Sequence, residues 1–170
     1  RQRQMCIRDS GTTTQVLARA VIDASGTYAT PNPLGANGLS AVGETRLGQR
    51  IWYGIPDVLG AERPRYAGKR VLVVGSGHSA FNALLDLAQL AQQEPETRIV
   101  WAVRRAALDP IFGGGANDAL PARGQLGQRL QAVIQAGALE VHTGLLIEQV
   151  RVTKRGILVS GGGTALPPVD

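Results

Sequence analysis

The chain has few of the residues that build disulfide frameworks, metal sites and acid–base centres. Among its 170 residues there are one cysteine, Cys6, and two histidines, His78 and His142. A single cysteine excludes an internal disulfide and a cysteine-rich metal site. Neither histidine stands in a recognisable pattern with a serine or with paired carboxylates, so the sequence offers no nucleophilic or acid–base constellation. We therefore expect no metal and no catalytic triad.

Aromatic residues are also scarce, at 4%, and no apolar run approaches the length of a membrane span. Hydrophobic residues nevertheless reach 44%, so the core must be built from Val, Leu, Ile and Ala. No secretory signal is visible, and we expect a cytoplasmic protein without a membrane partner. The net charge of +5 is almost all arginine, because only Lys69 and Lys154 are lysines. These arginines are scattered, so no nucleic-acid partner is expected.

The most regular stretch of the chain surrounds a pair of glycines. Four apolar residues, Val71–Val74, three of them β-branched, run directly into Gly75 and Gly77. Apolar residues then recur at helical spacing, at Phe81, Leu84, Leu85 and Ala88. This order of strand, tight turn and helix, with the spacing Gly-x-Gly-x-x-Gly/Ala, is typical of a dinucleotide-binding turn. An ordinary turn between a strand and a helix is the alternative.

Three positions of the turn have a role in phosphate binding. Gly75 permits the sharp turn, and Gly77 has no Cβ to block a close-lying pyrophosphate. Ala80, in the third position of the pattern, lets the helix pack close to the strand. The free N–H groups and the positive end of the helix dipole would then face the phosphates.

The other three residues of the turn are polar. Ser76, His78 and Ser79 complete the candidate cofactor-binding set. Ser79 either hydrogen-bonds a phosphate or caps the helix. His78 is interpreted more simply as an exposed loop residue.

The order of the predicted elements indicates an α/β fold. A strand is expected over residues 12–22, followed by a long irregular stretch that is typical of a functional loop or a crossover between domains. Beyond it we predict strands over 70–74, 98–103 and 139–142, helices over 79–91 and 124–135, and a hairpin of 145–152 with 157–160. The βαβαβ order predicts a Rossmann-like, three-stranded parallel sheet with a small antiparallel meander beside it.

The end of the second strand indicates which dinucleotide is bound. In this fold an acidic residue there binds the ribose 2′-hydroxyl of NAD, whereas arginine favours the 2′-phosphate of NADP. This strand runs into Arg104 and Arg105, with no acid before Asp109. A guanidinium offers phosphate a planar fork of donors. The sequence therefore favours NADP(H), the alternative being two solvated arginines at a strand end.

Three segments together resemble the two-dinucleotide-binding flavoproteins, which include flavin-containing monooxygenases and thioredoxin reductase-like oxidoreductases. Residues 68–80 resemble their NADPH-site turn, and residues 103–105 their basic 2′-phosphate motif. Residues 21–27 resemble the Ala-Thr-Gly segment that closes the FAD domain. The resemblance implies that Ala24, Ser25, Gly26 and Thr27 lie on the FAD side.

The resemblance also implies a division of the chain. Residues 1–10, which share no pattern with the rest of the chain, are expected to be non-native or disordered. The other expected segments are a C-terminal remnant of an FAD-binding domain (11–30), a crossover (31–67), the NAD(P)H-binding domain (68–163) and a return toward the FAD domain (164–170). The family's FAD-binding glycine turn is absent, which favours an internal fragment of a larger enzyme.

Two departures leave the reaction open. The segment before the glycine turn has no Cys-x-x-Cys, so dithiol reduction is not expected. Trp52 stands where the monooxygenase fingerprint places a histidine, four residues after Gly48. The leading hypothesis is the NADPH-binding domain of an FAD-dependent oxidoreductase, which passes hydride from NADPH to flavin. The alternative is a stand-alone, non-enzymatic Rossmann module that binds or senses nucleotide.

Overall fold

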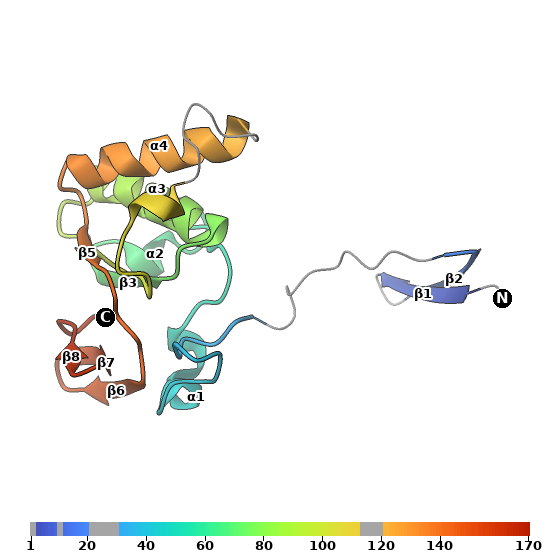
Figure 1. Ribbon diagram of the computed structural model, residues 1–170, viewed down its shortest axis with the longest axis horizontal. Helices are drawn as coiled ribbons and strands as arrows, with labels where there is room; N and C mark the ends of the chain where they lie inside the picture. The colour runs from blue at the N-terminus through green and yellow to red at the C-terminus, as the bar shows by residue number, and fades with distance from the viewer. Residues whose placement is uncertain (1–2, 10–11, 21–30, 113–120) are drawn as a thin grey trace. The chain divides into compact units, whose positions relative to one another are not determined.

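We describe the fold from a computed structural model, over residues 3–9, 12–20, 31–112 and 121–170 (Figure 1). The chain divides into two compact units, Arg1–Pro31 and Asn32–Asp170. Within the described residues, no helix is long and apolar enough to cross a membrane.

The first unit contains an antiparallel pair of strands. Strand β1 (Arg3–Asp9) pairs with β2 (Thr12–Ala18), with Met5 opposite Val16. The strand predicted from residue 12 onward is therefore confirmed as far as Ala18. No regular structure was expected in residues 1–10, whereas β1 occupies seven of them. A ladder is made by backbone groups, and it can form where the side chains show no period. The non-native origin of this segment stays a prediction.

The second unit is built on the parallel sheet that the sequence predicts. Its strands β3 (Arg70–Val74), β4 (Arg98–Ala102) and β5 (Glu140–His142) are hydrogen-bonded in the order β3-β4-β5, and both pairs are parallel. Helices α3 (His78–Gln93) and α4 (Pro121–Gln135) form the two connections and pack side by side (Figure 1). The predicted Rossmann-like βαβαβ fold is thus confirmed.

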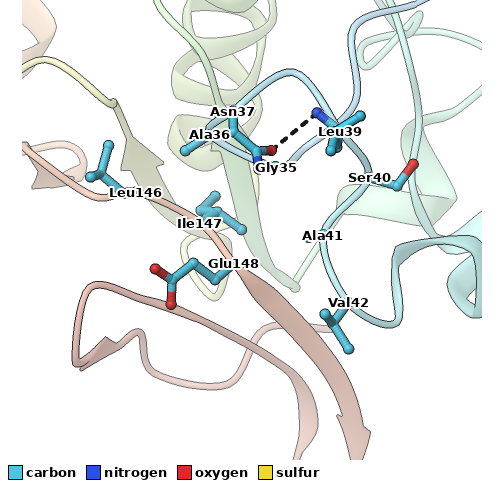
Figure 2. A pocket seen from close by; sticks show the side chains of 10 residues that line it. All are labelled: Gly35, Ala36, Asn37, Leu39, Ser40, Ala41, Val42, Leu146, Ile147 and Glu148. Carbon is cyan, nitrogen blue, oxygen red and sulfur yellow. Dashed lines mark hydrogen bonds between the residues drawn. The ribbon is translucent and has the colours of Figure 1, made fainter.

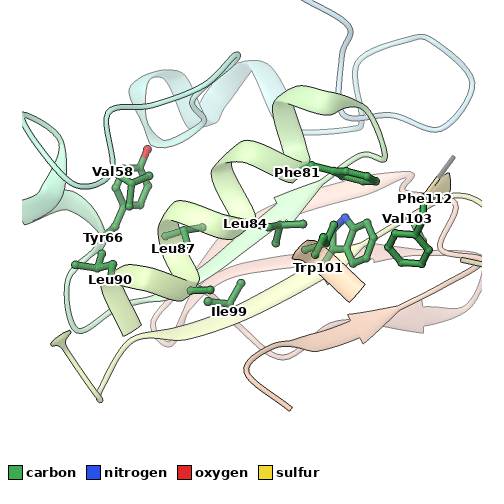
Figure 3. Close-up of a cluster of buried hydrophobic side chains, with 12 residues drawn as sticks. Val58, Tyr66, Phe81, Leu84, Leu87, Leu90, Ile99, Trp101, Val103 and Phe112 are labelled. Carbon is green, nitrogen blue, oxygen red and sulfur yellow. The ribbon is translucent and has the colours of Figure 1, made fainter. Parts of the chain in front are cut away.

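Alternate side chains of this sheet enter two different cores. Val71 and Val73 of β3 face the same core as Trp101, together with the buried residues of α3. Figure 3 shows this cluster, in which Phe81, Leu84, Leu87 and Leu90 of α3 lie over β4. The sheet is therefore apolar on both faces, as parallel sheets usually are.

The second face of the parallel sheet is covered by an antiparallel one. Strands β6 (Gln149–Thr153), β7 (Gly156–Gly161) and β8 (Thr164–Ala165) form it in that order. Its buried residues pack with the side chains of β3 and β4 that point away from α3, and together they form a second core. This core includes Leu72, Val74, Val100, Ala102, Leu145, Ile147, Val150, Ile157 and Val159. The predicted hairpin and meander are confirmed, although the first hairpin strand, expected over 145–152, begins only at Gln149. Gly156 has the positive φ of 120° expected at the hairpin turn.

The region before β3 packs within the same unit. It contains the short helices α1 (Glu44–Leu47), η1 (Gly48–Arg50) and α2 (Arg63–Tyr66), and a further short helix, η2 (Asp109–Ile111), follows β4. Val42 forms a parallel bridge with Gln149, which ties this region to β6. The crossover was expected over residues 31–67, and its residues 32–67, which lie in this unit, contribute to both cores.

Several element boundaries differ from the prediction. Helix α3 begins one residue earlier and ends two later than expected, and α4 begins at Pro121 rather than at residue 124. Proline is well suited to a first helical turn because the missing N–H has no partner there. Strand β4 stops at Ala102, although the Val103 N–H still donates to the His142 carbonyl at 2.9 Å. Residues 161–170, expected as a loop, contain β8 and a bridge between Val169 and Ile157.

Candidate nucleotide-binding site at the glycine turn

Gly75 and Gly77 differ in whether the backbone conformation at their position requires glycine. Gly75 has φ of +117°, a conformation that side chains with a Cβ rarely adopt. Gly77 has φ of −88° and ψ of 172°, which any residue adopts. A Cβ added at Gly77 would meet no atom of the described chain within 4 Å. Neither the backbone nor its neighbours therefore require glycine at position 77, and the open space beside it fits a ligand that approaches closely.

The N-terminus of α3 is open to solvent. Gly77 is the N-cap, and Gly77, His78 and Ser79 are all exposed. The first intrahelical hydrogen bond runs from the Phe81 N–H to the Gly77 carbonyl at 3.1 Å. The amides of the first turn therefore lack intrahelical partners and are available to an anion. Ser79 lies inside the first turn rather than at the N-cap, so the capping role is wrong and the phosphate contact remains its predicted role.

The turn is attached to β4 by two hydrogen bonds. The Gly75 N–H donates to the Ala102 carbonyl at 3.1 Å, and the Trp101 indole Nε1–H donates to the Gly75 carbonyl at 2.7 Å. Ala80, which the sequence predicted to allow close packing, is half-buried.

The two predicted arginines follow β4 at the same edge of the sheet. Because Val74 is paired with Ala102, Arg104 and Arg105 leave the sheet beside the glycine turn. Both side chains are exposed. Arg104 Nη1 donates to the Ala36 carbonyl at 2.8 Å, which fixes its guanidinium against a neighbouring loop. The Arg105 carbonyl accepts from the Gly144 N–H at 2.8 Å, which anchors the backbone there.

The other residues singled out in the sequence lie elsewhere. Ala24, Ser25, Gly26 and Thr27 fall outside the described residues. His142 is half-buried, and its Nε2 is 2.7 Å from Glu140 Oε1. This contact, aided by Arg70 at 2.9 Å, holds the pKa of Glu140 below its ordinary value. His142 thus lies at the end of β5 in a structural hydrogen-bonding group with Glu140, which also contacts Arg70 of β3.

Sequence reasoning missed a pocket whose lining includes no residue of the glycine turn. Its volume is about 380 Å³, and residues 35–37, 39–42 and 146–148 line it (Figure 2). Leu39, Val42 and Leu146 leave much of their apolar surface exposed beside it. The only signal in the sequence was the glycine- and proline-rich character of the loop that begins at Pro31.

A buried carboxylate organises that loop. Glu44 is only 3% exposed, and it accepts hydrogen bonds from the Leu34 N–H at 2.8 Å, the Ala41 N–H at 2.7 Å and the Tyr53 hydroxyl at 2.5 Å. Burial opposes its ionisation, but these hydrogen bonds outweigh burial and leave the pKa of Glu44 below its ordinary value of 4.5. Burial, together with the bond to Glu44, raises the pKa of Tyr53 to about 12.

We expect Glu44 to make the stability of this unit depend on acid pH. Since its pKa is lower in the folded chain, its contribution is complete above pH 4.5 and is lost as the pH falls through the lowered value. Glu44→Gln should lower the free energy of unfolding at pH 7 by about 2 kcal/mol, because bonds to charged groups contribute about 1.5–3 kcal/mol.

Urea denaturation at pH 7 and at pH 3.5 measures both effects. The variant should lose less stability between the two pH values than the wild type does. Glu148→Gln, which alters an exposed carboxylate, should behave as the wild type. Identical acid dependence in the wild type and Glu44→Gln would contradict the assignment.

The fold is a Rossmann-type α/β unit, and the exposed start of α3 lies at the end of its first parallel strand. No protein-family model matches the chain, and no curated protein matches it in sequence. Similar solved structures include the bacillithiol disulfide reductase of Bacillus cereus, at 16% identity and a TM-score of 0.49, covering 97% of this chain and 46% of that one. The bacillithiol disulfide reductase of Staphylococcus aureus has 15% identity and a TM-score of 0.40, covering 60% and 26%.

A third similar structure is the reduced form of an ornithine hydroxylase from Pseudomonas aeruginosa, at 16% identity and a TM-score of 0.42, covering 61% of this chain and 34% of that one. The chain thus spans between about a quarter and a half of the length of these proteins.

Proposed function

We propose that residues 68–163 bind NADP(H) and form the nucleotide-binding part of an FAD-dependent oxidoreductase. The observation that carries this proposal is Gly77. Its backbone conformation is ordinary and its surroundings are empty, which fits a ligand that approaches the backbone closely. The proposal includes the cytoplasmic location and the small-molecule partners that the sequence predicts.

Two parts of the cofactor, its pyrophosphate and its 2′-phosphate, would meet suitable groups at this edge of the sheet. The amides at the start of α3 and the turn Gly75–Ala80 would bind the pyrophosphate. Arg104 and Arg105 would bind the 2′-phosphate, because a guanidinium pairs with phosphate oxygens through two parallel N–H donors. The nucleotide supplies hydride chemistry, and the chain's own residues bind it and orient it. The alternative function is a non-enzymatic module that binds nucleotide without passing hydride to a flavin.

Titration of the 170-residue chain with NADP⁺ and NAD⁺ tests the proposal. Isothermal titration calorimetry should detect NADP⁺ binding at one site, with weaker binding of NAD⁺. Absence of heat with both nucleotides, in a chain shown by circular dichroism to be folded, would refute it.

The same preparation should contain no stoichiometric FAD. The sequence has only one glycine turn with the required strand before it and helix after it, and that turn is assigned to NADP(H). The ratio of visible flavin absorbance to protein absorbance measures bound flavin directly. A yellow protein with one equivalent of flavin would contradict the assignment of an FAD-domain remnant. It would require a second binding site for a dinucleotide pyrophosphate.

A further inference from the structure

Trp101 lies directly beneath the glycine turn, although it is 26 residues from Gly75 in sequence. Its side chain is completely buried on the helix side of β4. The ring packs edge-to-face on Phe81, at 6.0 Å between centroids, and lies 6.5 Å from the ring of Phe112 (Figure 3). These contacts fix the indole plane and so fix the direction of its N–H.

The indole N–H of Trp101 and the backbone carbonyl of Ala102 each hold one of the two peptide groups that flank Gly75. The indole of Trp101 donates to the Gly75 carbonyl, and the Ala102 carbonyl accepts from the Gly75 N–H. The peptide planes before and after Gly75 are therefore each held by one hydrogen bond to β4. Gly75 is the turn residue with φ of +117°, so these bonds hold the position at which the chain reverses.

The second of these peptides carries the amide of Ser76. The peptide is planar and trans, so its N–H points opposite to its carbonyl. Because the Gly75 carbonyl points into the core toward Trp101, the Ser76 N–H points out of the core. Among the described residues, no acceptor is bonded to this amide. The next residue, Gly77, has open space where its Cβ would be.

We propose that Trp101 is a positioning residue for nucleotide binding, which acts through the Gly75 peptide to direct the Ser76 N–H at the pyrophosphate. This inference rests on the function proposed above. It assigns the aromatic cluster a role in recognition in addition to packing. It also predicts that only ligands with a pyrophosphate depend on the indole N–H.

The test removes the N–H and keeps an aromatic ring. Trp101→Phe should weaken NADPH binding about five- to tenfold, the usual effect of losing one hydrogen bond. Adenosine 2′-monophosphate, which lacks the pyrophosphate, should bind the variant and the wild type equally. Phe112→Leu is the control, because it loosens the same cluster without removing a bond to the turn, and it should leave NADPH affinity within about twofold.

A second substitution provides an independent test in case Trp101→Phe does not fold. Incorporation of 3-benzothienylalanine at position 101 replaces the indole N–H with sulfur and preserves the shape of the ring. It should reproduce the loss of NADPH affinity. Unchanged NADPH affinity in both variants, or equal losses for NADPH and adenosine 2′-monophosphate, would overturn the positioning role.

An NMR measurement without nucleotide separates the two proposals. In ¹⁵N-labelled chain, the amide signals of Ser76 and Gly77 should shift in the Trp101 variants and remain in place in Phe112→Leu. If the wild type fails to bind NADPH, the proposed function is refuted. In that case, turn signals that move only in the Trp101 variants support the structural attachment, and unmoved signals overturn it as well.

Discussion

Gly77→Val should abolish NADPH binding while the chain remains folded. The branched side chain would occupy the space in which a Cβ meets no atom within 4 Å, and that space is where the pyrophosphate is proposed to lie. The cost to folding should be small, because φ of −88° is ordinary for valine. Valine is a poor N-cap, so we expect a loss of about 1 kcal/mol in the free energy of unfolding.

Gly75→Val is the matched control for this substitution. It also adds a side chain to open space, but at φ of +117°, where backbone strain itself destabilises the fold. Thermal unfolding should therefore separate the two variants, with the larger loss at Gly75. Calorimetric titration then measures NADPH affinity in the folded Gly77→Val chain. Wild-type affinity in that variant would remove the turn from the binding site.

Arg104→Ala and Arg105→Ala should each weaken NADPH binding about ten- to a hundredfold, since hydrogen bonds to charged groups contribute about 1.5–3 kcal/mol. NADH lacks the 2′-phosphate, so its affinity should change little. The two variants should differ in one respect. Arg104 also holds the Ala36 carbonyl, and its loss should loosen the loop that lines the pocket in Figure 2.

Titration of both nucleotides against each variant distinguishes recognition from support of the fold. Arg155→Ala, at the exposed turn between β6 and β7, removes the same charge and should leave both affinities unchanged. Equal losses for NADH and NADPH would assign Arg104 and Arg105 a structural role. Tighter binding of NADH by the wild type would overturn the preference for NADP.

The elements that the sequence predicted well are those with local signals. Strand β3 was predicted residue for residue, because four apolar residues end at a glycine that the turn requires. Helix α3 was predicted to within two residues, since its buried positions recur at helical spacing along its length. Both glycines of the turn were identified because strand, turn and helix are contiguous in sequence.

The features that sequence reasoning missed depend on distant contacts. Helices α1 and α2 have four residues each, too few for a helical period to appear. Glu44 has the sequence character of an exposed acid, and its burial depends on Tyr53 and on backbone amides up to ten residues away. The bond from Trp101 to Gly75 links two elements whose pairing is known only once the sheet has formed.

Because both faces of the parallel sheet are buried, the register of its strands has to be specified by the sizes of their side chains. In a strand with one polar face, a shift of one residue exposes apolar side chains and is rejected on that ground. In β4 both faces are apolar, so such a shift would exchange one apolar set for another. It would, however, press the indole of Trp101 into the space of Ala102, and overpacking of that kind costs about 1–3 kcal/mol. The largest side chain of the core is therefore also the residue that excludes misregistered forms of the sheet.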